Sequence, residues 1–181
     1  MKKILIGLIG PIGGGKGLAV EHIIKKFKFK SVILGDLVRE DTKKEKLELT
    51  RENLRAIAKK YRKKYGRYYL INRAVKRLKN SKKGLIDGLR MPDETLKAKK
   101  LGTKIILIDA KPRLRFERTK KRARVGFSKT FKQFQKENKE EAKIYKFNKT
   151  FKYAEHKILN NKGKKEFFRN IDKLFEKLLK K

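Results

Sequence analysis

The stretch that decides the fold is Ile4-Leu5-Ile6-Gly7-Leu8-Ile9-Gly10-Pro11-Ile12-Gly13-Gly14-Gly15-Lys16. Residues 4–9 form an apolar run of the kind that is buried on both faces of a parallel sheet. After a glycine-rich turn at 10–17, apolar side chains recur at helical spacing through Phe27. The order of strand, glycine-rich loop and helix predicts the first unit of an α/β fold.

Residues 10–16 match the pattern G-x-x-x-x-G-K between the predicted strand and helix. In this pattern the glycines let backbone N–H groups turn toward phosphate oxygens, and the helix N-terminus adds positive potential. The lysine supplies a point charge for the β and γ phosphates, so we expect ATP to bind here, with Lys16 as a catalytic residue. The residues expected to contact the nucleotide are Gly10, Pro11, Ile12, Gly13, Gly14, Gly15, Lys16, Gly17 and Leu18.

The rest of the chain continues the alternation of strands and helices. Short apolar runs at 32–34, 84–87, 104–108 and 156–159 predict four further strands. Right-handed crossovers make such strands parallel, so we expect a three-layer α/β/α P-loop NTPase fold with a five-stranded parallel sheet. Helix start signals lie at Thr50, Pro92, Thr130 and Pro112, the last opening a helix expected to run through Arg124.

The length of 181 residues predicts a single domain spanning residues 1–181. Within it we expect a helical acceptor-binding segment at about 36–80 and a short helical lid at about 112–150.

Charged side chains follow the ends of the predicted strands. Asp36 comes after the second strand and Asp87 ends the third. The carboxyl ends of parallel strands lie at one edge of the sheet, so both carboxylates should meet the glycine-rich loop. An aspartate beside such a loop is the expected place for a carboxylate of a Mg²⁺ shell. Asp36 could instead cap a short helix, and Arg39 could form a surface ion pair with the neighbouring residues 40–41.

Several of these motifs resemble those of the P-loop kinases, in particular the adenylate kinase branch. Gly15-Lys16-Gly17 is similar to the adenylate kinase motif, although Leu18 replaces the threonine that usually follows. The stretch 35–39 resembles Gly-Asp-x-x-Arg, and 87–90 resembles Asp-Gly-Phe-Pro-Arg, with one residue fewer and no proline. This resemblance implies that Asp36, Arg39 and Arg90 serve the acceptor and that Asp87 holds Mg²⁺ through water.

The last third of the chain extends the resemblance. Arg118-x-x-x-Arg122 is similar to the lid arginines that cover the ATP base and phosphates, which implies a catalytic role for both. In a helix this basic, a solvated face is the alternative. Residues 158–163 resemble the closing strand and loop of dephospho-coenzyme A kinase relatives, which implies that Asn161 lies near the adenine.

Together these features predict an ATP- and Mg²⁺-dependent phosphotransferase with a small nucleotide-type acceptor, foremost a nucleoside monophosphate. Transfer to the ribose hydroxyl of dephospho-coenzyme A is the alternative, and it would make Asp36 a general base. Two further hypotheses stay open. One is an adenylate-kinase-like ATPase acting on RNA or ribosome assembly. The other is a protein that binds nucleotide without turnover, because Gly17 and Leu18 lack hydroxyl groups.

The composition bounds the remaining possibilities. The chain has 55 Lys and Arg against 19 Asp and Glu, a formal net charge of +36. Nucleic acid is a possible partner, but biased composition with solvated lysine faces is the favoured explanation of the charge. Tyr61, Tyr65, Tyr68 and Tyr69 among basic residues suit base stacking or helix packing. The absence of cysteine excludes thiolate chemistry and Cys-ligated zinc. Without an apolar run long enough to span a bilayer, we expect a cytoplasmic protein with no membrane contact.

Overall fold

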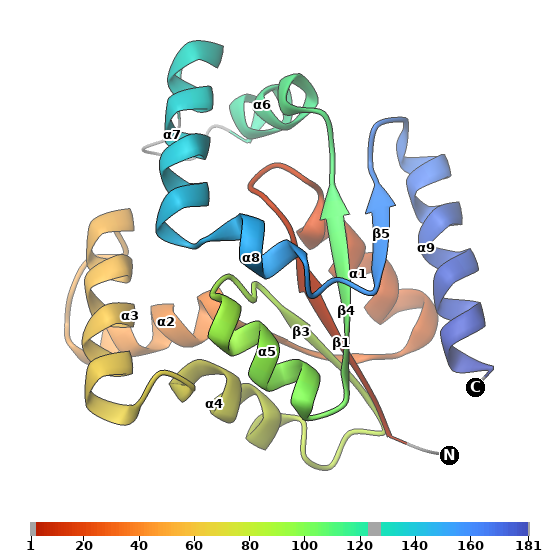
Figure 1. Cartoon of the computed structure of the whole chain (residues 1–181), viewed down its shortest axis with the longest axis horizontal. Helices are drawn as coiled ribbons and strands as arrows, with labels where there is room; N and C mark the ends of the chain where they lie inside the picture. The colour runs from red at the N-terminus through yellow and green to blue at the C-terminus, as the bar shows by residue number, and fades with distance from the viewer. Residues whose placement is uncertain (1–2, 123–127, 181) are drawn as a thin grey trace.

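The computed structural model describes residues 3–122 and 128–180, in which five parallel strands form one sheet (Figure 1). The strands are β1 (Ile4–Ile9), β2 (Lys30–Ile33), β3 (Lys83–Asp87), β4 (Thr103–Asp109) and β5 (His156–Leu159). They lie in the order β2-β3-β1-β4-β5, so β1, which leads into the glycine-rich loop, is central. The predicted five-stranded parallel sheet is confirmed.

Helices lie on both faces of the sheet and over the ends of its strands (Figure 1). One face is covered by α1 and α9, and the other by α2, α4 and α5. The helices α6 and α7 lie beyond the carboxyl ends of the strands. The helices are α1 (Lys16–Phe27), α2 (Leu34–Lys44), α3 (Arg51–Tyr65), α4 (Tyr69–Arg77), α5 (Pro92–Lys100), α6 (Pro112–Lys121), α7 (Phe131–Ile144), α8 (Phe147–Phe151) and α9 (Lys164–Leu179).

Side-chain alternation along β1 fills two cores. Leu5 and Ile9 pack among residues of α2, α4 and α5, whereas Ile6 and Leu8 pack among residues of α1 and α9. All four side chains are buried. This burial on both faces is what the uninterrupted apolar run predicts, because a strand that faced water on one side would alternate with polar residues.

Most of the predicted helix starts are present. Thr50 accepts a hydrogen bond from the N–H of Asn53 at the start of α3, and Thr130 accepts one from Gln133 at the start of α7. Pro92 and Pro112 open α5 and α6. The short α8 was not expected. The helix expected to run from 112 through 124 is found to 121, and its last two residues lie outside the described part of the chain.

The boundary between β2 and α2 differs from the prediction. Residue 34 was assigned to the strand, but β2 ends at Ile33, which pairs with Asp87, the last residue of β3. Beyond that point the neighbouring strand offers no further partner, and Leu34 instead begins α2 with its side chain buried. Asp36 therefore lies in the first turn of α2 and does not cap a helix.

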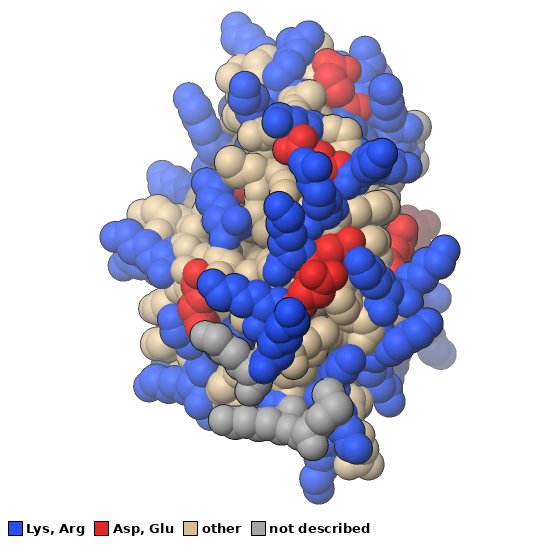
Figure 2. Space-filling model, turned by 90° about the vertical axis from the view of Figure 1, so that its right-hand side faces the viewer, with Lys and Arg blue, Asp and Glu red and all other residues tan. Residues whose placement is uncertain are grey.

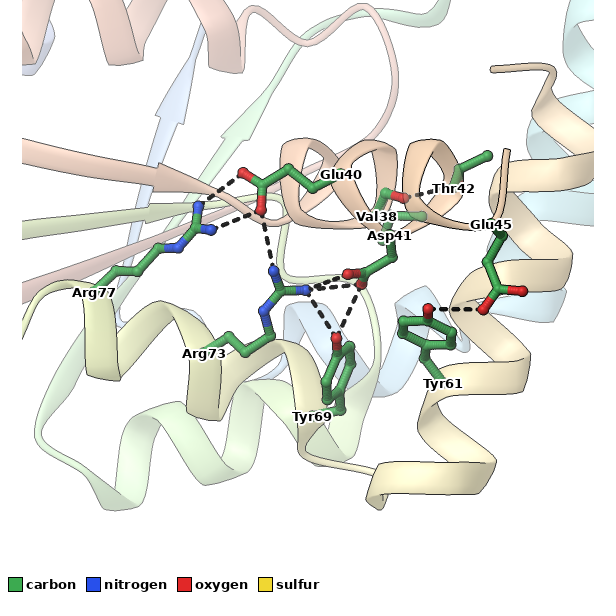
Figure 3. A network of polar contacts seen from close by, with 9 residues as sticks. All are labelled: Val38, Glu40, Asp41, Thr42, Glu45, Tyr61, Tyr69, Arg73 and Arg77. Carbon is green, nitrogen blue, oxygen red and sulfur yellow. Dashed lines mark hydrogen bonds and ion pairs between the residues drawn. The ribbon is translucent and has the colours of Figure 1, made fainter. Parts of the chain in front are cut away.

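Ion pairs join α2 to α4 (Figure 3). The buried carboxylate of Asp41 accepts hydrogen bonds from Nη1 of Arg73 at 2.7 and 2.8 Å and from the hydroxyl of Tyr69 at 3.2 Å. Glu40 bonds to Arg73 and to the exposed Arg77. The alternative in which Arg39 pairs with residues 40–41 is not found, because α4 already supplies partners for both carboxylates.

This network makes a stability prediction. Arg73→Met keeps most of the aliphatic stem but leaves the buried Asp41 without its cation, so we expect a loss of about 3 kcal/mol in the free energy of unfolding. Arg77→Met removes an exposed pair and should cost at most about 1 kcal/mol. Denaturant unfolding measures both, and equal losses in the two variants would contradict the assignment.

Candidate functional site

Glycine backbone geometry shapes the loop between β1 and α1. Gly13 and Gly15 adopt φ angles of +76° and +109°, which side chains disfavour. A Cβ on Gly13 would lie 2.5 Å from the carbonyl oxygen of Arg115, and one on Gly15 would lie 2.2 Å from Nδ2 of Asn160. The loop is therefore wedged between α6 and the segment after β5, and only glycine fits at these two positions.

The N-terminus of α1 is open to an anion. Gly15 is the N-cap, no side chain caps the helix, and its first turn holds no acidic residue. Nζ of Lys16 donates hydrogen bonds to the carbonyl oxygens of Gly10 at 2.7 Å and Pro11 at 3.1 Å. Burial lowers the pKa of Lys16 to about 8, against the opposing effect of Asp87. Backbone N–H groups, a helix dipole and a lysine thus converge at the loop, as phosphate binding requires.

Asp87 lies at the carboxyl end of β3, directly beside Leu8 of β1. Its side chain is buried, and its Oδ1 atom has no hydrogen-bond partner among the described residues. Burial raises the pKa of this carboxyl group, while Lys16 and Arg90 act in the opposite direction. A buried carboxylate oxygen without a partner fits an additional ligand, such as water on a metal ion.

The two positions that lack hydroxyl groups differ in their surroundings. A Cβ on Gly17 would meet nothing within 4 Å, so space for a larger side chain is open there. Leu18 packs against the core formed by α1 and α9. The Leu18 side chain therefore contributes to the packing of this core.

Asp36 and Arg39 form an ion pair with each other on the exposed surface of α2. The charge of Asp36 contributes to the raised pKa of Asp87, which places the start of α2 near the end of β3. The sequence predicts that Asp36 and Asp87 lie at one edge of the sheet. Ile33, just before α2, pairs with Asp87, but the carboxylate of Asp36 is engaged by Arg39.

The helix α7 reaches the site through two carboxylates one turn apart. Glu141 is buried and accepts a hydrogen bond of 3.0 Å from Nη1 of Arg90. Glu137 forms an ion pair of 3.5 Å with Arg51 at the start of α3. The charge of Glu141 also influences the pKa of Lys16. The described part of the 112–150 segment thus contacts Arg90 after β3 and the 36–80 segment at Arg51.

Arg115 joins α6, α7 and the loop. Its Nη1 donates to the carbonyl oxygen of Ile12 at 3.2 Å and to Oδ1 of Asn138 at 2.8 Å, and its Nε donates to Ala110 at 3.2 Å. This arginine is buried, so its three partners fix the loop relative to both helices.

The two arginines expected in the lid lie one turn apart at the C-terminal end of α6. Nη2 of Arg118 donates to the carbonyl oxygen of Asn160 at 2.8 Å, and its buried Nη1 has no partner in the described structure. Arg122 is the exposed C-cap of α6, and its charge together with burial lowers the pKa of Arg118. Asn161 accepts a hydrogen bond from the N–H of Lys111. Arg118 therefore contacts the segment after β5 that also contains Asn161.

Sequence reasoning missed three residues of this site. Asn160, whose Nδ2 donates to the carbonyl oxygen of Gly14, holds the loop from the α9 side, and Arg115 holds it from α6. Glu141 bonds to Arg90 beside the loop. One signal was available for Glu141. It lies seven residues after Phe134, two helical turns along the face that Phe134 buries, and a carboxylate on a buried face needs a partner.

No group of three or more acidic or histidine side chains could hold a metal ion directly among residues 3–122 and 128–180. Over the same residues, none of the helices is both long enough and apolar enough to cross a membrane.

Similar proteins place this fold and loop in a class. Residues 9–146 match a family model described as an AAA domain. The backbone is similar to shikimate kinase from Bacteroides thetaiotaomicron, with a TM-score of 0.66 at 14% identity, over 97% of this chain and 98% of the other. Shikimate kinase from Acinetobacter baumannii, in complex with shikimate, gives a TM-score of 0.63 at 14% identity, over 98% and 94%. The fold is that of a P-loop kinase-like NTPase, and the chain belongs to the AAA domain family.

Closer sequence similarity extends over almost the full chain. A UPF0200 protein of Thermococcus gammatolerans is 33% identical, over 98% of this chain and 96% of the relative. Another from Thermococcus onnurineus is 32% identical over 97% and 98%, and one from Methanocaldococcus jannaschii is 30% identical over 97% and 91%. The chain therefore belongs to the UPF0200 family.

The wedged loop makes a matched pair of glycine substitutions informative. Gly15→Ala places a methyl group against Asn160 at a positive φ and should lower the free energy of unfolding by about 1–3 kcal/mol. The methyl group of Gly17→Ala would lie in open space in the first turn of α1. This substitution should raise the free energy of unfolding by up to about 1 kcal/mol. Denaturant unfolding measures both changes. A Gly15→Ala protein as stable as the parent would contradict the close approach of Gly15 to Asn160.

Proposed function

We propose that this protein transfers the γ-phosphate of ATP to a small nucleotide-type acceptor, foremost a nucleoside monophosphate. The observation that supports this most is the cluster formed by Lys16, Asp87 and Arg90 at the carboxyl edge of the sheet, where the charge of Arg90 acts on both Lys16 and Asp87. Phosphoryl transfer depends mainly on alignment and charge neutralisation, which such a cluster supplies.

The donor half of the site is the glycine-rich loop. Its N–H groups and Lys16 would hold the triphosphate, with Lys16 exchanging its two carbonyl partners for phosphate oxygens. The remaining contacts are assigned to residues 10–15, 17 and 18. Asn161 follows β5 at the edge where Arg118 lies, so the adenine would bind there.

Asp87 would hold hydrated Mg²⁺, and its unpartnered, buried Oδ1 fits that role. When bound, Mg²⁺ neutralises charge that develops on the transferring phosphate. The absence of a larger direct-ligand cluster in the described chain agrees with a metal held largely through water.

The acceptor would lie between Arg39 and Arg90, on the side of the 36–80 segment. An ionised oxygen of the acceptor phosphate attacks the γ-phosphorus, and the bond from that phosphorus to the β–γ bridging oxygen breaks to leave ADP. This attack needs no general base. Asp36 already pairs with Arg39, and this engagement favours a phosphate acceptor over the ribose hydroxyl of dephospho-coenzyme A.

Arg118 and Arg122 would act from the lid, which we assign to about 112–150. The buried Nη1 of Arg118 is an unused donor that a nucleotide phosphate or base could accept from. Closure of α6 and α7 over the loop would exclude water from the transfer.

A labelled-phosphate assay tests the proposal. We expect label from ATP, with Mg²⁺, to move to one member of a panel of nucleoside monophosphates and dephospho-coenzyme A, and Lys16→Ala to lower this rate at least about 100-fold. Label on dephospho-coenzyme A alone would establish the alternative acceptor. If ATP binds but no acceptor is labelled, the proposed function fails.

Glu141 makes a second prediction for the same site. Its carboxylate accepts a hydrogen bond from Arg90, the arginine that we assign to the acceptor phosphate. The acceptor must therefore displace the Glu141 carboxylate from Arg90. Glu141→Gln should tighten acceptor binding about tenfold, as expected when a charge-assisted hydrogen bond no longer competes. Glu137→Gln, one turn away and paired with Arg51, is the control and should change acceptor binding little. Titration of the acceptor measures both, and weaker binding to Glu141→Gln would mean that Glu141 positions Arg90 instead.

A further inference from the structure

The helix α3 is unusual in how little of it contributes to the core. All fifteen of its residues are described, and Ile57 alone is buried. Leu54 and Ala58 pack against the core from partly buried positions, and Tyr61 and Arg62 bond to Glu45 and Glu94. Eight of the fifteen residues are exposed. Figure 1 shows α3 at the edge of the molecule farthest from α9. Most of this helix is therefore available to a partner.

The charged residues of α3 are predominantly basic. Seven of its fifteen residues are Lys or Arg, and Glu52 is the one acidic residue. Arg55, Lys59 and Lys63 lie four residues apart, so they form one exposed stripe along the helix. None of the three forms an ion pair within the described residues. Like charges at this spacing destabilise a helix, and a negatively charged ligand would relieve that repulsion.

The opposite side of the molecule shows that this pattern is local. Figure 2 views the face around α9, where Lys and Arg side chains are interspersed with acidic ones. The sixteen residues of α9 include five basic and three acidic ones. Two of these acids, Asp172 and Glu176, form ion pairs with Lys26 of α1. The basic residues of α9 are thus partly offset by acidic residues of the same helix, whereas α3 has seven basic residues against one acidic residue.

An exposed aromatic ring lies at the C-terminal end of α3, two residues beyond Lys63 and therefore on a different side of the helix from the stripe. Tyr65 is 51% exposed and stacks on Tyr69, with ring centroids 5.1 Å apart. The hydroxyl of Tyr69 is fixed by Asp41, and that of Tyr61 is fixed by Glu45 (Figure 3). Two tyrosines are therefore anchored in the fold, whereas Tyr65 rests on them with its ring accessible. Nζ of Lys64 lies 5.1 Å from the centre of the Tyr65 ring.

We propose that α3 binds single-stranded nucleic acid, with phosphates along Arg55, Lys59 and Lys63 and a base stacked on Tyr65. A single strand that follows the stripe would turn around the C-terminal end of α3, past Lys64, to reach the Tyr65 ring. Basic side chains that follow the phosphates, together with an aromatic ring for a base, are how proteins bind single strands without reading their sequence. An anionic membrane is less suited to this surface, because Leu54, Ile57 and Ala58 face the body of the protein and leave no apolar face to insert. This binding is separate from the proposed phosphotransfer.

The test compares two triple variants with matched charge and spacing. Arg55→Gln/Lys59→Gln/Lys63→Gln removes the stripe on α3, and Lys165→Gln/Arg169→Gln/Lys173→Gln removes an exposed stripe of the same composition on α9. Binding of a labelled 20-nucleotide oligouridylate is measured by anisotropy over a range of KCl concentrations, without ATP. The α3 variant should reduce the slope of log K against log salt by about 2, the value for three lost phosphate contacts. The α9 variant should keep the parental slope.

Tyr65→Ala should weaken binding about tenfold or more at one salt concentration, while Tyr65→Phe should retain it. Lys16→Ala should bind the RNA like the parent, which keeps this result distinct from failure of the proposed function. Equal loss in the α3 and α9 variants would overturn the proposal in favour of diffuse attraction. So would full binding by Tyr65→Ala, or binding to anionic phosphatidylserine vesicles that matches the RNA and is lost in the same variants.

Discussion

The glycine-rich loop can be formed only if the chain passes within contact distance of Asn160 on one side and of Arg115 on the other. This close approach permits no side chain at Gly13 or Gly15, where the backbone also adopts positive φ angles. The same constraint directs the N-terminus of α1 toward the carboxyl edge of the sheet. Because β1 is central and pairs with β3, Asp87 comes to lie beside the loop. The site thus follows from backbone geometry and strand register more than from any one side chain.

The charged groups around the loop are held in a partly desolvated arrangement. Burial lowers the pKa of Lys16 and raises that of Asp87, so in the absence of ligand each group is less easily charged than in water. Lys16 donates hydrogen bonds to two loop carbonyl groups, and Arg90 donates one to Glu141. These internal contacts occupy the groups that we assign to phosphates. A phosphorylated ligand would replace them with stronger charge-assisted hydrogen bonds, and the protein would gain binding energy without a large rearrangement.

The parts of the structure that depend on local signals could be predicted from the sequence. Local sequence determines the strand at 4–9, the helix caps at Thr50 and Thr130 and the glycine-rich loop. The alternation of strands and helices then predicts a parallel sheet. Contacts between segments distant in the chain could not be predicted in this way. Asn160 lies 146 residues from the carbonyl it holds, and Arg115 lies 103 residues from Ile12. The position at which β2 ends also could not be predicted, because it depends on where its neighbour β3 ends. The roles of Asp36, Arg118 and Arg122 remain predictions.

The most direct test of the phosphate-binding loop is the affinity for ATP between pH 7.5 and 9.5. The free protein holds Lys16 at a pKa of about 8, and bound phosphate would stabilise the charged amine. Below that pKa the amine is protonated in both states, so affinity should stay constant. Above it, binding must take up a proton, and affinity should fall by up to about tenfold per pH unit. Lys16→Arg, which stays charged throughout, should show no such fall. An affinity in the parent protein that stays constant to pH 9.5, or the same fall in Lys16→Arg, would contradict the placement of Lys16 on the phosphates.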